Sequence, residues 1–253
     1  MKISYKKYKP LHNAPLLHSI ELKIAGEAVE EKDKYPFCVP IIHNFQKITF
    51  TKPVTFFVGE NGTGKSTLLE AIAYQIGFGP EGGSKNIAFS TTKATAAQLG
   101  RLMKLTWNYK PMDGYFFRAE TFFNIASYLD AIDGNKSYGG KSLHHQSHGE
   151  SFLSFFKHRL DGTGIYIFDE PEASLSPQCQ LALLNIIHNL TQHNTAQCII
   201  ATHSPILLAY PGATIYSCDG DRLKKIEYTQ TDHYQITKRF LNDPHVFFKQ
   251  LFS

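Results

Sequence analysis

Residues 59 to 66 read Gly-Glu-Asn-Gly-Thr-Gly-Lys-Ser and fit the pattern G-x-x-x-x-G-K-[ST] at every position. Glycines in such a loop let backbone N–H groups turn inward around phosphate oxygens. Lys65 can place its charge on the β- and γ-phosphates, and the Ser66 hydroxyl can ligate magnesium. The pattern therefore predicts a phosphate-binding loop for a nucleotide. Its expected contact residues are Asn61, Gly62, Thr63, Gly64, Lys65, Ser66 and Thr67.

An acid pair, Asp169 and Glu170, directly follows the apolar run 165–168. A buried strand there would deliver both carboxylates to the sheet edge where α/β proteins bind ligands. We expect Asp169 to hold magnesium and Glu170 to act as the general base on the attacking water. Because successive strand side chains point to opposite faces, the chain must turn at this pair. Pro171 biases Glu170 toward an extended conformation.

A histidine stands at the end of a third apolar run, 198–201, in the sequence Thr202-His203-Ser204-Pro205. If this run is a parallel neighbour of the other two, His203 lies at the same sheet edge. There it can donate to the γ-phosphate or help to position the water. We therefore expect His203 to join Glu170 as a catalytic residue.

The elements that position these residues follow from hydrophobic periodicity. The run 54–58 is typical of a buried strand before the glycine loop. Apolar residues after the loop recur at helical spacing, which predicts a helix there. Strand 165–168, helix 178–189 and strand 198–201 form a βαβ rhythm, which predicts a mostly parallel sheet with helices on both faces. Asp219-Gly220 predicts a hairpin, and a short helix is expected over 236–248. The predicted fold class is α/β, a P-loop NTPase.

Domain organisation is expected to be simple. The chain of 253 residues suits one domain, 1–253, with an inserted lobe. The range of about 84–160 mixes helical and strand-like patterns with a loop rich in Gly, Ser and His. We expect this range to form the insertion.

Composition excludes several classes of protein. Hydrophobic residues make up 42% and charged residues 19%, which is typical of a globular chain. No apolar run approaches a membrane span, and no signal peptide opens the chain, so we expect a cytoplasmic protein without membrane insertion. The four cysteines form no C-x-x-C pair. A net charge of +4 permits a nucleic-acid partner without indicating one.

The order of these motifs resembles ABC-type ATPases, especially their soluble branch related to SMC and recombination-repair ATPases. Residues 169–177 look like the Walker B motif and D-loop of that group, and 202–205 look like its switch-histidine loop. Residues 147–151, Ser-His-Gly-Glu-Ser, look like a variant signature motif, with His148 where a glycine is common. The chain is similar, over nearly its whole length, to small stand-alone bacterial ATPases.

The resemblance implies an ABC-ATPase-like fold whose inserted, mainly helical lobe carries the signature motif. It also implies an ATP hydrolase that uses ATP and Mg²⁺ and yields ADP and phosphate. Two subunits would sandwich the nucleotide head to tail, so that Ser147, Gly149 and Glu150 of one subunit complete the site of the other. The Q-loop residue is left open between Glu120 and Gln98, and the residue that stacks on adenine is unassigned.

The leading functional hypothesis is a soluble ABC-type ATPase that drives or switches a protein partner in DNA maintenance or phage defence. One alternative is the nucleotide-binding subunit of a membrane transporter, against which the variant signature and the run after Glu170 argue. A P-loop kinase would not need Glu170, the signature and His203 together. An ATP-gated binding module with negligible turnover is a further alternative.

Overall fold

The computed structural model describes residues 14–23, 33–79, 82–84, 96–121, 153, 156–157, 160, 164–192 and 195–252. Its strands are β1 (Leu17–Leu22), β2 (Lys47–Thr49), β3 (Val54–Val58), β4 (Met103–Trp107), β5 (Gly114–Arg118), β6 (Gly164–Asp169), β7 (Ala196–Ala201), β8 (Thr214–Ser217) and β9 (Lys224–Ile226). Its α-helices are α1 (Pro40–His43), α2 (Lys65–Ile76), α3 (Ala96–Leu102), α6 (Pro177–Thr191), α7 (Pro205–Leu208), α8 (Asp232–Asn242) and α9 (Pro244–Leu251). Two 3₁₀ helices are η4 (Pro171–Ser174) and η5 (Tyr228–Gln230).

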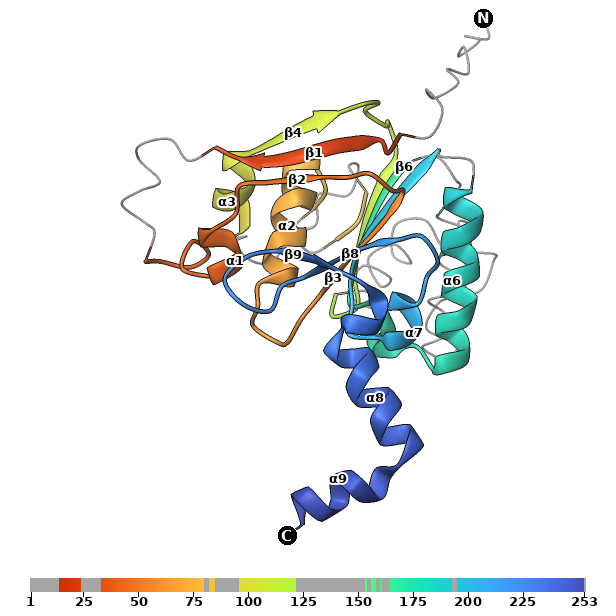
Figure 1. Cartoon of the computed structure of the whole chain (residues 1–253). Helices are drawn as coiled ribbons and strands as arrows, with labels where there is room; N and C mark the ends of the chain where they lie inside the picture. Colours follow the sequence, from red (N-terminus) through yellow and green to blue (C-terminus); the bar gives the residue numbers. More distant parts are fainter. Residues whose placement is uncertain are drawn as a thin grey trace, which may run out of the picture.

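A six-stranded sheet forms the centre of the described chain, in the order β5-β6-β7-β3-β8-β9. All of its neighbouring pairs are parallel except β8 and β9, which form the predicted antiparallel hairpin. Helices α2 and α3 lie on one side of this sheet, and α6 and α7 lie on the other (Figure 1). The predicted mostly parallel sheet with helices on both faces is therefore confirmed.

The central strands are apolar throughout because both of their faces are buried. Every residue of β3, β6 and β7 is buried, and successive side chains enter opposite cores. Phe57 packs in the core shared with α2, whereas Phe56 packs in the core shared with α6. This two-sided burial holds the carboxyl ends of the strands in a fixed row.

A second, three-stranded antiparallel sheet, in the order β2-β1-β4, covers the α2 side of the molecule (Figure 1). The fully buried side chain of Gln197, on β7, connects the two sheets. Its Oε1 accepts from the Leu17 backbone N–H at 2.7 Å, and its Nε2 donates to the Leu17 carbonyl at 3.4 Å. Sequence periodicity did not predict this sheet.

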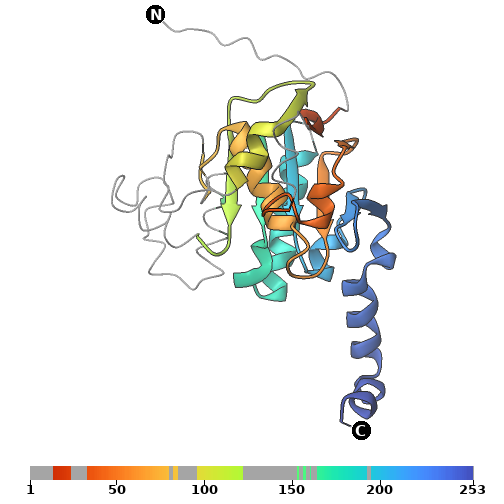
Figure 2. The ribbon, with the colours of Figure 1, turned by 90° about the vertical axis from the view of Figure 1, so that its left-hand side faces the viewer.

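Part of the range expected as an inserted lobe belongs to the two sheets. Within 84–160, β4 pairs with β1, and β5 forms the edge of the central sheet beside β6. Residues 122–152 lie outside the described residues, so the rest of the lobe stays a prediction. The closing helix expected over 236–248 is two helices, α8 and α9, which extend away from the body (Figure 2).

Candidate active site

The carboxyl ends of five neighbouring strands meet at one edge of the central sheet. The phosphate loop follows β3, Asp169 ends β6, and Arg118 ends β5. His203 follows β7, and Asp219 follows β8. This edge is where α/β sheets bind ligands, and the predicted site residues from three separate segments converge on it.

The loop between β3 and α2 has a backbone that depends on glycine. Gly64 adopts φ 95°, and a Cβ there would lie 2.6 Å from the Val39 side chain. Both the left-handed conformation and the close approach exclude a larger residue. The N-terminus of α2 begins at Lys65, directly behind the loop, and adds its positive end to the phosphate site.

The Lys65 side chain is buried inside this loop. Its Nζ donates to the carbonyl oxygen of Gly59 at 2.7 Å and to that of Glu60 at 2.9 Å. The ammonium group is therefore held at the point around which the loop turns. A phosphate bound by the loop would meet this charge and the backbone N–H groups together.

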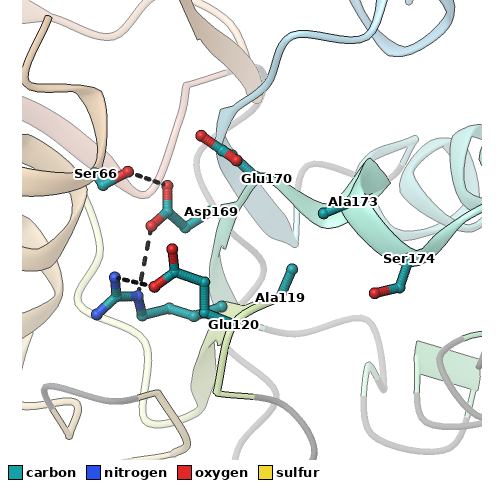
Figure 3. A pocket seen from close by; sticks show the side chains of 8 residues that line it. Ser66, Ala119, Glu120, Asp169, Glu170, Ala173 and Ser174 are labelled. Atoms are coloured by element: carbon teal, nitrogen blue, oxygen red, sulfur yellow. Dashed lines mark hydrogen bonds and ion pairs between the residues drawn. The ribbon is translucent and has the colours of Figure 1, made fainter. Parts of the chain in front are cut away.

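Asp169 is buried beside Ser66 (Figure 3). The Ser66 hydroxyl donates to Asp169 Oδ1 at 3.0 Å, and Arg118 Nε lies 3.5 Å from Oδ2. Burial raises the pKa of Asp169 to about 7, although the Arg118 charge and the Ser66 hydrogen bond both oppose that rise. Arg118 also pairs with Glu70 at 3.0 Å, so acidic groups lie on two sides of its guanidinium.

The Ser66 and Asp169 oxygens fit a magnesium ion. Mg²⁺ prefers hard oxygen ligands in an octahedron, and adjacent ligands then lie about 3 Å apart. The observed 3.0 Å between Ser66 Oγ and Asp169 Oδ1 matches that spacing. Mg²⁺ commonly takes only one or two protein ligands and completes its shell with water and phosphate oxygens. Ser66 and Asp169 are therefore the residues that would hold it.

Glu170 turns the chain away from β6, but not in the predicted extended conformation. It adopts φ 50° and ψ 52°, in the left-handed region that residues other than glycine rarely occupy. Its carbonyl accepts from Ala173 N–H at 3.1 Å, and its own N–H donates to Ala201 O at 3.0 Å. Because η4 must start at once, the bias imposed by Pro171 is overridden. Glu170 consequently leaves the line of β6, and its side chain lines the same pocket as that of Asp169 (Figure 3).

His203 lies beside Glu170 at the carboxyl edge of the sheet. Its Nε2 is 3.4 Å from Glu170 Oε1, and its Nδ1 is 2.9 Å from His233 Nε2. The backbone N–H of His203 donates to Glu172 Oε1 at 2.6 Å. Sequence reasoning missed both Glu172 and His233 as site residues. Glu172 lies within residues 169–177, which resemble a Walker B motif and D-loop, whereas His233 belongs to no recognised sequence motif.

The structure distinguishes the two Q-loop alternatives by position. Glu120 lines the same pocket as Ser66 and Asp169 and pairs with Arg118 at 3.4 Å. Gln98 is exposed on α3 and does not line that pocket. Only Glu120 is therefore placed at the site. Ser147, Gly149 and Glu150 lie outside the described residues.

Tyr35 is an aromatic residue at the rim of the phosphate loop. Its hydroxyl lies 2.8 Å from Thr67 Oγ1, and its ring lines the pocket formed by Asn61, Lys65 and Glu170. The side chain is about half exposed. A flat ring in this place is available to a nucleotide base, a role that the sequence alone left unassigned.

Comparisons with known proteins agree with this site. A family model described as an AAA domain matches residues 38–106, which include the phosphate loop. A second, described as "AAA domain, putative AbiEii toxin, Type IV TA system", matches residues 151–209, which include Asp169, Glu170 and His203. No curated protein matched the sequence. Within the described residues, no helix has the length and apolar character needed to cross a membrane.

Solved structures of ATP-binding cassettes share the fold. The chain is similar to cbiO1 from Clostridium perfringens, part of the ABC transporter complex cbiONQ, at 15% identity and a TM-score of 0.52. It is also similar to a nucleotide-free ATP-binding cassette from an ABC transporter, at 17% identity and a TM-score of 0.50. In each case the match covers 92% of this chain and 97% of the other. Two segments of the chain therefore match models of AAA domains, and the chain has the fold of P-loop ATP-binding cassettes.

Proposed function

We propose that the chain binds ATP with Mg²⁺ and hydrolyses it to ADP and phosphate. The observation that carries this proposal is the convergence of Ser66, Asp169, Glu170 and His203 at one sheet edge. Ser66 Oγ lies 3.0 Å from Asp169 Oδ1, and His203 Nε2 lies 3.4 Å from Glu170 Oε1. Two oxygens suited to a metal thus stand beside a carboxylate and an imidazole suited to proton transfer.

The two carboxylates of the acid pair have different surroundings and therefore different roles. Asp169 is buried against Ser66 and Arg118, which suits a metal ligand. The Glu170 side chain is 40% exposed, so it can reach an attacking water and accept its proton. His203 Nε2, which lies 3.4 Å from Glu170 Oε1, can donate to the γ-phosphate as negative charge develops on it. Bound Mg²⁺ would neutralise phosphate charge.

We propose further that ATP is held between two copies of the chain. Ser147, Gly149 and Glu150 of the second copy would meet the γ-phosphate, as the resemblance to ABC-type ATPases implies. The ring of Tyr35 would lie against the base. Formation and release of this dimer would drive or switch a protein partner. DNA maintenance or phage defence is the process proposed from that resemblance.

Replacing Glu170 by Gln tests the assignment of the general base. The amide keeps the size and the hydrogen bonding of the side chain but cannot accept the proton. We expect single-turnover hydrolysis to fall by about 10²- to 10⁴-fold. ATP affinity should change little, because the lost interaction belongs to the transition state.

Glu21→Gln is a matched control, since Glu21 is an exposed residue of β1, in the other sheet. It should hydrolyse ATP at the wild-type rate. Wild-type turnover by Glu170→Gln would place the base elsewhere. Tight ATP binding by a wild-type protein that shows no hydrolysis, even in a single turnover, would instead favour an ATP-gated binding module.

A further inference from the structure

His233 contacts the site from an element that the proposed function does not use. It lies in the first turn of α8, thirty residues beyond His203 in the sequence. The distance from its Nε2 to His203 Nδ1 is 2.9 Å, and the ring centroids are 5.0 Å apart. One ring must donate this hydrogen bond and the other must accept it.

The position of Glu170 indicates which ring donates the hydrogen bond between His203 and His233. A neutral imidazole has one N–H, on either Nδ1 or Nε2. His203 Nε2 makes no hydrogen bond in the described part of the chain, but it lies 3.4 Å from Glu170 Oε1, so a proton on Nε2 would face a carboxylate oxygen. The proton of neutral His203 is therefore favoured on Nε2. His203 Nδ1 is then an acceptor, and His233 Nε2 must be the donor.

The second ring nitrogen of His233, Nδ1, also indicates that His233 Nε2 is the donor. His233 Nδ1 is buried, and no hydrogen-bond partner for it lies in the described part of the chain. A proton on Nδ1 would leave a buried donor without an acceptor, which is unfavourable. The proton of neutral His233 is therefore favoured on Nε2, where it meets His203.

The surroundings of His233 lower its pKa overall, which favours its neutral form. Burial lowers its pKa most, and the neighbouring His203 lowers it further. Glu60 and Asp219 act in the opposite direction, while Lys65 adds to the lowering. A neutral His233 keeps an N–H on one nitrogen and a lone pair on the other, as the hydrogen-bond pattern requires.

We propose that His233 is a positioning residue for ATP hydrolysis, which donates to His203 Nδ1 and thereby holds the His203 proton on Nε2. This inference rests on the proposed function, since Nε2 is the nitrogen that faces Glu170 and the place of the γ-phosphate. Without the donor, neutral His203 can carry its proton on either nitrogen. Part of the population then presents a lone pair where a donor is needed. The first turn of α8 is thus a component of the site.

Single-turnover hydrolysis of three full-length variants tests the role of His233. His233→Leu removes the donor and should lower the rate by about 10- to 100-fold, as is usual for a partner that orients a functional histidine. His233→Gln supplies an amide N–H near the same place and should recover most of that loss. His245→Leu, at an exposed histidine of α9, is the control and should match the wild type. A wild-type rate for His233→Leu overturns the proposal.

The tautomer of His203 can also be observed directly. Long-range ¹H–¹⁵N NMR spectra with ATP and Mg²⁺ should show the wild-type proton on Nε2, and a mixture of tautomers in His233→Leu. A wild-type proton on Nδ1 overturns the proposal. This measurement separates the two failures, because a wild type that does not hydrolyse ATP contradicts the proposed function and leaves the histidine pairing to be decided by the spectra.

Discussion

Lys65 holds a positive charge in a buried place where the loop backbone partly satisfies it. Its Nζ donates to two loop carbonyls and can turn to phosphate oxygens without a large movement of the chain. We expect Lys65→Ala to weaken ATP binding by about 1.5–3 kcal/mol, the usual cost of losing a hydrogen bond to a charged group. Calorimetric titration measures this difference. Lys52→Ala, at an exposed lysine before β3, is the control, and equal affinities of Lys65→Ala and wild type would contradict the assignment.

Asp169 should make the free energy of unfolding decrease as pH rises, which is opposite to the usual effect of a carboxyl group. Its pKa is about 7 in the folded chain, against an ordinary value of 3.8, chiefly because of burial. Between these values the folded carboxyl is protonated and the unfolded one is ionised, so folding takes up a proton. This contribution is therefore full below the ordinary value and is lost as pH rises toward 7. The buried Asp169 carboxylate, which is suited to binding a cation, therefore lowers the free energy of unfolding at neutral pH.

Asp169→Asn removes that titration. Without nucleotide or Mg²⁺, we expect the wild type to lose about 2 kcal/mol of unfolding free energy relative to the variant between pH 5 and pH 8. Urea denaturation at both pH values measures this change. If the two proteins show parallel pH dependence, then Asp169 is already ionised at pH 5 and the explanation is wrong.

At the scale of elements, the loop after β8 supports the phosphate loop. Asp219 Oδ1 accepts from the Glu60 N–H at 2.8 Å, and its Oδ2 accepts from the Ser217 hydroxyl at 3.1 Å. A Cβ on Gly59 would lie 3.0 Å from Asp219 Oδ1, so the two loops are in close contact. The closing hairpin therefore helps to fix the conformation that binds phosphate.

Asp219→Ala should weaken ATP binding by about 1 kcal/mol, the usual contribution of one hydrogen bond, or about fivefold in affinity. Asp221→Ala is a closely matched control, because that carboxylate belongs to the same connection and is 77% exposed. Fluorescence or calorimetric titration compares the two variants. The same loss of affinity in both would mean that the effect comes from overall charge rather than from the contact with Glu60.

Elements with a strong local pattern could be predicted from the sequence, and those defined by distant partners could not. β3, β6 and β7 are continuous apolar runs because they are buried on both faces. β2 has only three residues, and its place is fixed by pairing with β1. Helical spacing also does not tell which residues of α6 are buried, since Leu181 is 58% exposed whereas Leu183 is buried.

The same division applies to the site. The loop and acid-pair motifs located Ser66, Asp169 and Glu170 because each follows a recognisable strand. His233 reaches His203 only because the chain returns after the hairpin, and neither residue type nor spacing reveals that contact. The conformation of Glu170 was wrongly predicted because the bias before a proline is weaker than the hydrogen bonds that start η4.

At the scale of the whole molecule, the site lies open at the sheet edge. The side chain of Glu170 is 40% exposed, and that of His203 is 28% exposed. Catalysis of phosphoryl transfer gains from excluding bulk water and from donors that surround the γ-phosphate. In the described part of the chain, the candidate groups lie at the carboxyl ends of the strands. The proposed dimer would add a second surface there.

The proposed dimer predicts self-association that depends on ATP. Glu170→Gln, which should bind ATP without consuming it, is expected to dimerise with ATP and Mg²⁺ and to be more dissociated without nucleotide. Light scattering at micromolar concentrations measures the mass. Adding Ser147→Arg to this variant should prevent the dimer while ATP affinity stays within a few fold, because Ser147 is expected to act across the interface. A monomer under every condition would contradict the dimer, and a dimer unaffected by Ser147→Arg would place the interface on another surface.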